Sequence, residues 1–142
     1  MTGGARGREW LAANLPHQGS MNLLAAIADW SAESLQATAT GHRDPSNPLR
    51  RAGVLPVAAA IEYAAQAAAA HGALLASAHS GPGMLVAVRG VQFHATRLDD
   101  VTGALQVAVE RLGGDDTGVI YRFDVSAQGR SLAAGRLTVA FR

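Results

Sequence analysis

The feature that most constrains the fold is an alanine-rich segment over residues 56–78. It begins at Pro56, which suits a first helical position because no helical hydrogen bond needs its missing N–H, and it ends at the Ser-Gly-Pro-Gly stop of residues 80–83. A helix over this segment has about 23 residues and is about 34 Å long. Because it is apolar on all sides, it must be surrounded by protein, and its small side chains let a sheet approach closely. We therefore predict a long central helix, with Ile61 and Tyr63 as core residues.

The length of this segment also fits a membrane span, with Arg50 and Arg51 as a flank. Composition argues against a span, since alanine drives insertion weakly and Glu62, Gln66 and His71 would each need a partner in hydrocarbon. Charged residues interrupt the N-terminal stretch, so it does not resemble a signal peptide. We expect a cytoplasmic protein without membrane contacts.

Strand patterns lie on both sides of the predicted helix. Residues 21–40 alternate loosely around 31–34, which indicates two strands joined by a turn, although a helix is a competing interpretation. After the helix, four segments alternate between apolar and polar residues: 85–95, 101–112, 119–127 and 132–141. Turn residues separate the last three at 113–116 and 128–129. A short helix over 7–14 and an ordered loop over 42–55 complete the interpretation.

The order of these elements predicts the fold class. On the 119–127 strand the inward face holds Val119, Tyr121, Phe123 and Val125. Strands, one long helix and a further run of strands, without βαβ alternation, indicate an α+β fold in which an antiparallel sheet wraps around the helix. A length of 142 residues suits a single domain spanning 1–142.

Composition excludes several classes of function. The chain has no cysteine, which removes disulfides, thiolate nucleophiles and cysteine-ligated zinc, and which fits a reducing compartment. The histidines have no partners at metal-ligand spacing, so we expect neither a metal nor a redox cofactor. The net charge is +1 and aromatic residues make up 5%, so there is neither a basic stripe nor a set of stacking platforms for nucleic acid.

One polar pair stands out on the apolar helix. Glu62 and Gln66 lie at i and i+4, so they share a face near the helix N-terminus. An ionised carboxylate is costly in a core. One interpretation is that Glu62 pairs with an arginine such as Arg89 or reaches solvent. We favour the other, in which Glu62 lies beside free backbone N–H groups and faces a histidine from a neighbouring loop. Together these groups are the parts needed for proton abstraction next to a carbonyl. His71 lies about 180° around the helix from Glu62, and we predict that it packs elsewhere.

Several motifs occur in order along the chain: LPHQGSMNLL at 15–24, NPLRR at 47–51 and LPVAAAIEYAAQAAAAHG at 55–72, with weaker agreement in MLVAVRGVQF and GRLTV. With them the sequence resembles the hotdog-fold 3-hydroxyacyl-(acyl carrier protein) dehydratases, and it is closest to the branch found in aryl-polyene pigment pathways. The resemblance covers nearly the whole chain. It implies that the long helix is the centre of a hotdog fold, that two protomers pair their sheets, and that each active site lies at the dimer seam.

The resemblance also implies roles for particular residues. Glu62 falls at the acidic helix position of the family, followed by Gln66 as a substrate-binding residue. In the fatty-acid enzymes the catalytic histidine lies in an H-x-P-G-N-P loop, which compares with HRDPSNP at 42–48, although the stretch from Asn47 to Glu62 is about five residues longer here. In the aryl-polyene branch the LPH histidine is more characteristic. The resemblance therefore makes His17 the first choice for the base and His42 the second.

The implied reaction is elimination of water from a 3-hydroxyacyl thioester to give a trans-2-enoyl product, as in fatty-acid or polyketide biosynthesis. His17 or His42 would take the C2 proton, and Glu62 would protonate or hold the departing hydroxyl. Backbone N–H groups of Val57 and Ala58 would polarise the thioester carbonyl. No cofactor is needed for this chemistry.

The resemblance implies two kinds of partner, an acyl carrier protein that delivers the substrate and a second hotdog subunit in a homodimer or heterodimer. Two alternatives to an active dehydratase stay open. The chain is either a non-catalytic partner in a dehydratase heterodimer or a hotdog thioesterase, because one fold hosts all of these activities. The sequence leaves open the acyl chain length and the choice between carrier protein and coenzyme A.

Overall fold

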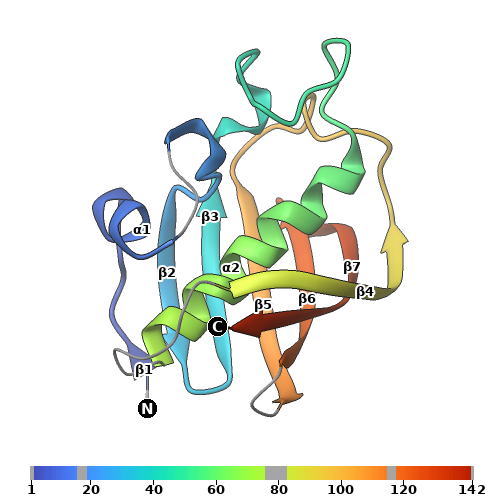
Figure 1. Cartoon of the computed structure of the whole chain (residues 1–142). Coiled ribbons are helices and arrows are strands. Elements are labelled where there is room, and N and C mark those ends of the chain that lie inside the picture. Colours follow the sequence, from blue (N-terminus) through green and yellow to red (C-terminus); the bar gives the residue numbers. More distant parts are fainter. Residues whose placement is uncertain (1, 16–18, 76–82, 115–117, 142) are drawn as a thin grey trace.

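A seven-stranded antiparallel sheet wraps around one long helix in the computed structural model, which describes residues 2–15, 19–75, 83–114 and 118–141 (Figure 1). The strands are β1 (Thr2–Gly3), β2 (Ala26–Ser31), β3 (Ser34–Ala39), β4 (Gly83–Phe93), β5 (Leu105–Gly114), β6 (Val119–Ala127) and β7 (Arg130–Phe141). The helices are α1 (Arg8–Asn14) and α2 (Ala60–Leu75), with 3₁₀ turns η1 (Gly19–Met21), η2 (Gly41–Arg43) and η3 (Val57–Ala59). The strand order is β1-β2-β3-β5-β6-β7-β4, and the predicted α+β class is confirmed.

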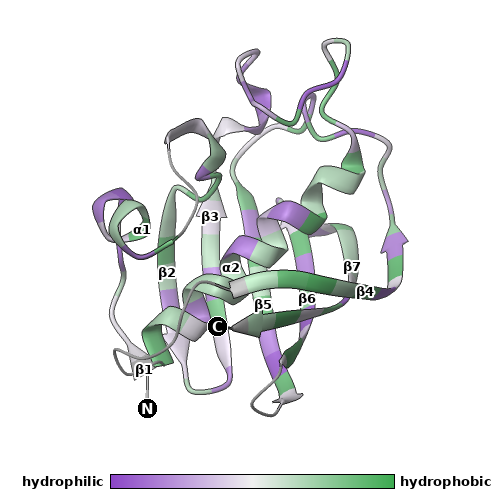
Figure 2. Ribbon diagram, in the orientation of Figure 1, coloured by the Kyte–Doolittle hydropathy of each residue, from purple (hydrophilic) through white to green (hydrophobic). Residues whose placement is uncertain are grey.

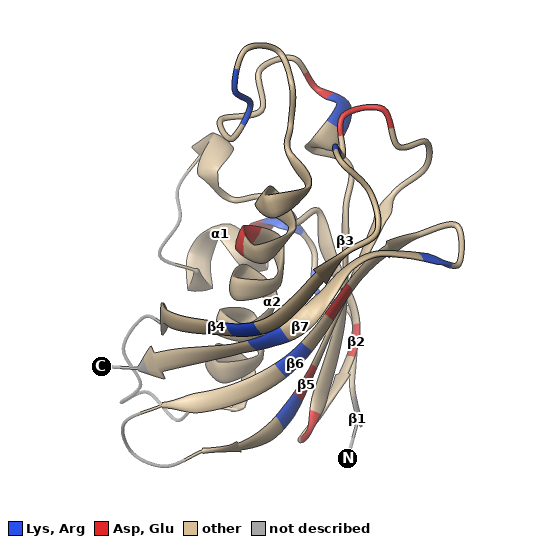
Figure 3. Ribbon diagram, turned by 90° about the vertical axis from the view of Figure 1, so that its right-hand side faces the viewer, with Lys and Arg blue, Asp and Glu red and all other residues tan. Residues whose placement is uncertain are grey.

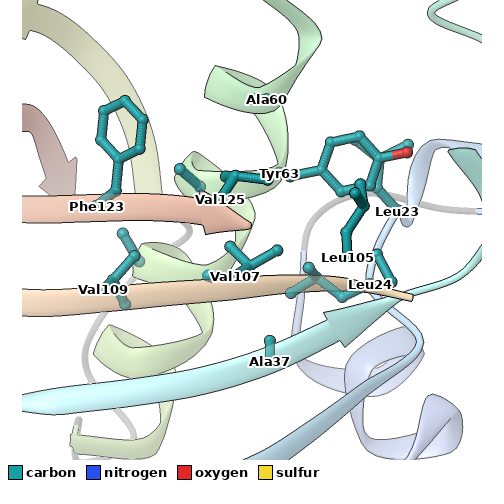
Figure 4. Close-up of a cluster of buried hydrophobic side chains, with 14 of the residues drawn as sticks. Leu23, Leu24, Ala37, Ala60, Tyr63, Leu105, Val107, Val109, Phe123 and Val125 are labelled. Carbon is teal, nitrogen blue, oxygen red and sulfur yellow. The ribbon is translucent and has the colours of Figure 1, made fainter. Parts of the chain in front are cut away.

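The core lies between the concave face of the sheet and α2. On β6 the four residues predicted to face inward, Val119, Tyr121, Phe123 and Val125, are all buried. They meet the inward residues of the neighbouring strand, including Val107 and Val109 of β5 (Figure 4). Three alanines of α2, Ala64, Ala67 and Ala68, have no exposed surface. Small side chains therefore let the sheet pack directly against the helix, as the sequence indicated.

The start of α2 is tied to the chain that follows β4. Pro56 precedes the helix in an extended conformation (φ −67°, ψ 152°), and η3 leads into the α-helix at Ala60. The predicted helix therefore starts with a 3₁₀ turn, and its last predicted residues, 76–78, lie outside the described part of the chain. The Leu98 N–H donates to the Leu55 carbonyl (2.8 Å), and the Val57 N–H donates to the Thr96 carbonyl (3.1 Å). These bonds set where the first helical turn lies relative to the sheet.

Burial of α2 is incomplete on one side. Ala58 is exposed, and Ile61, Glu62 and Ala65 are half-buried. Ala58 belongs to η3 and the other three to α2, and we call these four residues together the open stripe of α2. The expectation that protein surrounds the helix on all sides therefore fails for this chain by itself, although Ile61, predicted as a core residue, is partly buried and packs against the core. The reason is geometric, because a single curved sheet covers only the side of a helix that faces it.

The edge strand β4 carries a second apolar surface. It pairs only with β7 in the sheet order, and Met84, Val86 and Val88 are exposed on it at 50%, 55% and 36%. Figure 2 shows that its middle is largely hydrophobic. An edge strand has unpaired backbone groups, and exposed apolar residues make it a surface for pairing with another chain.

Arginines meet in register on the sheet. Arg136 of β7 pairs with Arg122 of β6 on one side and with Arg89 of β4 on the other, and all three are exposed. Figure 3 shows basic segments side by side on these strands. Arg122 also binds Glu110 of β5 (2.6 Å). Directly opposed like charges repel, so this row costs stability in the isolated chain.

Candidate functional site

Glu62 occupies the first turn of α2 within the open stripe. Its carboxylate has no hydrogen bond or ion pair with another described residue. The described ion pairs are Arg97–Asp99 and Arg122–Glu110, so Glu62 is not paired with Arg89. The helix N-terminus stabilises negative charge here. The structure therefore holds a half-buried, unpaired carboxylate beside a surface that this chain leaves uncovered.

Gln66 lies one turn further along α2 and is completely buried. Its Oε1 accepts a hydrogen bond from the Leu23 N–H (2.9 Å), and its Nε2 donates to the Met21 carbonyl (2.6 Å). Both ends of the carboxamide therefore bind the main chain of the segment that follows the LPH motif. In this structure Gln66 positions that segment against α2 and has one Nε2 hydrogen left for any other contact.

His17, the first choice for the base, lies in the interval 16–18, outside the described residues. The chain is anchored on both sides of it. Leu15 is buried and its N–H donates to the Leu11 carbonyl (3.0 Å) at the end of α1. Leu23 is held by Gln66.

His42, the second choice for the base, is buried in η2 with 1% of its surface exposed. Its Nε2 lies 2.9 Å from the Val101 carbonyl oxygen. A carbonyl only accepts, so Nε2 carries the hydrogen and Nδ1 holds the free lone pair. Nδ1 is buried and has no partner among the described residues. His42 thus holds the segment after β4, and Nδ1 is its only nitrogen free to accept a proton.

The two backbone donors predicted for the carbonyl differ in availability. The Val57 N–H donates to Thr96, so it is already engaged. Ala58 is exposed in the first helical turn, and its N–H has no acceptor among the described residues outside that turn. Ala58 lies in the open stripe with Glu62, so the available donor and the carboxylate occur together at the start of the helix.

A cleft of about 280 Å³ lies beside this region, and we call it the Tyr63 cleft. It is bordered by Arg8 of α1, by the segment 20–25, by the loop 40–48 and by Tyr63 of α2. Neither Glu62 nor His42 lines it. Figure 4 shows the Tyr63 ring extending from α2 toward Leu23, with its hydroxyl at the far end. Tyr63 is buried, as predicted, but sequence reasoning missed its hydrogen bond to Asn47 (3.1 Å), although both residues lie in the quoted motifs.

His71 takes part in a separate network on the far side of the helix. Its Nε2 lies 2.8 Å from the Ser31 carbonyl oxygen, and its Nδ1 lies 2.8 Å from the Tyr121 hydroxyl. Burial lowers the pKa of His71, an effect partly opposed by the hydrogen bond to Ser31, and burial raises the pKa of Tyr121 to about 12. The prediction that His71 packs away from Glu62 is confirmed.

The described residues contain neither a membrane-spanning helix nor a cluster of metal ligands. None of the helices in that part of the chain is both long and apolar enough to cross a bilayer. The same residues contain no group of three or more potential metal ligands.

Comparison with known proteins adds independent information about this arrangement. Residues 10–141 match the family named ApeP-like, described as ApeP dehydratase. Among solved structures, a chain of the dehydratase heterocomplex ApeI:P from Xenorhabdus doucetiae is 28% identical, with a TM-score of 0.78 over 93% of this chain and 90% of that chain. No curated protein matches the chain.

More distant structures share the architecture. A mutant thioesterase from Pseudomonas aeruginosa is 18% identical, with a TM-score of 0.68 over 94% of this chain and 91% of that one. A thioesterase from Haemophilus influenzae is 12% identical, with a TM-score of 0.63 over 92% and 81%. At such identities the likeness shows the fold alone. The predicted hotdog fold is confirmed.

Proposed function

Since the chain belongs to the ApeP-like dehydratase family, a hotdog dehydratase group of the aryl-polyene branch, we propose that it removes water from a 3-hydroxyacyl thioester carried on an acyl carrier protein. The product would be the trans-2-enoyl thioester of fatty-acid or aryl-polyene-type polyketide biosynthesis. The observation that carries this proposal is the unpaired Glu62 carboxylate in the first turn of α2, four residues after Ala58, whose N–H is available at the start of the helix.

The chemistry follows from what each group can do. A histidine base, His17 first and His42 second, takes the C2 proton as the double bond forms between C2 and C3. Glu62, in its protonated form, gives a proton to the C3 hydroxyl, which leaves as water. The Ala58 N–H donates to the thioester oxygen and stabilises the negative charge that develops there. The resting protonation states return when the histidine passes its proton to Glu62 directly or through solvent.

A second hotdog subunit would complete this site. The open stripe of α2, which is apolar except for Glu62, and the exposed side chains of Met84, Val86 and Val88 on β4 are surfaces that this chain leaves uncovered. Pairing of β4 with the edge strand of another subunit would satisfy its free backbone groups and cover the stripe around Glu62. The likeness to the ApeI:P heterocomplex supports a heterodimer as the assembly.

The direct test uses mass spectrometry of a carrier protein loaded with a 3-hydroxyacyl chain. We expect a product lighter by one water when this chain is present with its partner subunit. Glu62→Gln should abolish the loss of water, whereas Glu33→Gln, at an exposed carboxylate in the turn before β3, should not. Full activity in Glu62→Gln would remove Glu62 from the mechanism.

The likeness to a heterocomplex also supports a second candidate, a partner subunit that shapes the acyl site while the other subunit performs the chemistry. In that case Glu62→Gln in this chain leaves dehydration by the complex unchanged, and the equivalent change in the partner abolishes it. Thioester hydrolysis is separated by the same assay, because it releases free thiol whereas dehydration keeps the thioester.

A further inference from the structure

The floor of the Tyr63 cleft contains a hydroxyl group with a hydrogen to donate. The Asn47 carboxamide has a fixed orientation, because its Oδ1 accepts from the Leu49 N–H (2.9 Å) and its Nδ2 donates to the Gly41 carbonyl (3.1 Å). The second Nδ2 hydrogen goes to the Tyr63 oxygen (3.1 Å). Tyr63 is therefore the acceptor in that bond. Its own O–H hydrogen has no acceptor among the described residues, although the side chain is fully buried.

A carboxamide without partners lies in the same cleft. Asn22 is 6% exposed and lines the cleft, and its Oδ1 is buried without a partner among the described residues. The main chain of Asn22 is fixed, since its N–H donates to Gly19 (3.1 Å) and its carbonyl accepts from Arg8 (3.3 Å). Its side chain makes no hydrogen bond to a described residue, so its oxygen is left to accept a hydrogen bond from a ligand. Buried polar groups without partners are rare and call for an explanation.

Charge at the mouth of the cleft is balanced. Arg8 donates to the carbonyls of Asn22 and Leu24 (3.3 and 2.6 Å), and Asp44 accepts two hydrogen bonds from Ser46 (2.9 and 2.8 Å). A phosphate site would need several free cationic or N–H donors, and an acyl chain would need an apolar floor. The buried groups of the cleft that lack a partner among the described residues are one neutral donor, the Tyr63 O–H, and one neutral acceptor, the Asn22 Oδ1, which is the pattern complementary to a secondary amide.

The size of the cleft restricts the ligand further. Its volume of about 280 Å³ lies below the roughly 300–1,000 Å³ of sites that enclose a whole small molecule. A segment of an extended ligand fits this space better than a complete cofactor. The exposed residues Ser20, Thr40 and Asp44 line its mouth, so an extended chain can enter from solvent.

We propose that the Tyr63 cleft binds an amide of a pantetheine arm, with the Tyr63 O–H donating to the amide carbonyl and the Asn22 Oδ1 accepting from the amide N–H. The choice of pantetheine rests on the proposed function, because pantetheine is the amide-bearing segment shared by carrier-protein and coenzyme A thioesters. The thioester end then extends from the cleft toward the open stripe of α2.

The test is a titration of the full ¹⁵N-labelled chain with pantetheine, followed by NMR of the asparagine side-chain amides. We expect the Asn22 and Asn47 signals to shift together. Tyr63→Phe should raise the Kd about three- to tenfold, the value of one neutral hydrogen bond. Asn22→Ala should have a similar effect, and it removes no described side-chain hydrogen bond, so it tests the site even if Tyr63→Phe folds poorly. Glu33→Gln, at an exposed carboxylate between β2 and β3, is the control and should leave the Kd unchanged.

Several results would overturn the proposal: no binding of pantetheine, shifts confined to Ile61 and Ala65, or equal Kd values in wild type, Tyr63→Phe and Asn22→Ala. Because the measurement needs no turnover, it is independent of the proposed reaction. Binding with the expected shifts but without dehydration would support the cleft and contradict the enzyme. Parallel titrations with coenzyme A and with a pantetheinylated carrier protein distinguish the two sources of the pantetheine arm. The natural source of the arm is expected to bind more tightly.

Discussion

Replacement of Gln66 by leucine tests the strongest tertiary contact near the candidate site. Leucine fills a similar volume but offers neither hydrogen bond, so the buried Leu23 N–H and the part-buried Met21 carbonyl lose their partners. Each unsatisfied buried group costs about 1–3 kcal/mol, and we expect the free energy of unfolding to fall by about 2–5 kcal/mol. Gln106→Leu, at an exposed position of β5, should change it by no more than about 0.5 kcal/mol.

Urea unfolding, followed by the fluorescence of Trp10 and Trp30, measures this change directly. A loss below about 1 kcal/mol in Gln66→Leu, with an unchanged m-value, would show that the two hydrogen bonds do not hold the segment. Equal losses in Gln66→Leu and Gln106→Leu would lead to the same conclusion.

Replacement of Gln66 by glutamate distinguishes the two hydrogen bonds through the pH dependence of stability. A glutamate still accepts from the Leu23 N–H, but an ionised carboxylate faces the Met21 carbonyl without a hydrogen to donate. Burial and this contact favour the protonated form, so the pKa of the new carboxyl rises on folding. A group whose pKa is raised by folding stabilises the folded state as pH falls. The variant should therefore gain stability relative to wild type between pH 7 and about pH 5, and an unchanged difference would contradict the assigned geometry.

Three further perturbations test the core and the sheet. Folding lowers the pKa of His71 from 6.5, so the imidazole binds its proton more tightly in the unfolded chain. The contribution of His71 to stability should therefore disappear as pH falls below about 6.5. Thermal unfolding at pH 5 and pH 7 measures this loss, and His71→Gln should make stability depend less on pH. Arg136→Gln removes repulsion from Arg122 and Arg89 and should stabilise the chain by about 0.2–1 kcal/mol. The gain should be larger at low salt, and urea unfolding at two ionic strengths measures it. Phe123→Ala leaves a cavity between β6 and α2 and should cost about 3–5 kcal/mol in the same assay.

Contrary outcomes for these three changes are equally specific. An unchanged pH response in His71→Gln would mean that His71 does not bind its proton more weakly in the folded state. A loss of stability in Arg136→Gln at low salt would mean that the arginine row is not repulsive. A cost below about 1 kcal/mol for Phe123→Ala would contradict its place in the core.

The sequence by itself determined the class of fold and most of its elements. Alternation along 119–127 predicts which residues face inward, because a strand must bury one face, and the structure buries all four. The alanine-rich segment predicts the central helix for a similar reason, since such small side chains let a sheet pack closely against a helix. The motif around Glu62 predicts the family, and the match over residues 10–141 shows it.

The partners of individual polar groups were decided by the tertiary structure alone. Gln66 binds main-chain groups more than forty positions earlier in the chain, and His71 binds Tyr121 fifty positions later. A periodic pattern indicates the face on which a residue lies, but it carries no information about which distant group the folded chain brings to that face. The same limit explains why full burial was expected for Ile61, which packs against the core but is only partly covered in the open stripe. Complete coverage of α2 depends on how far one sheet can curve, and that is a property of the assembled sheet and not of any segment of sequence.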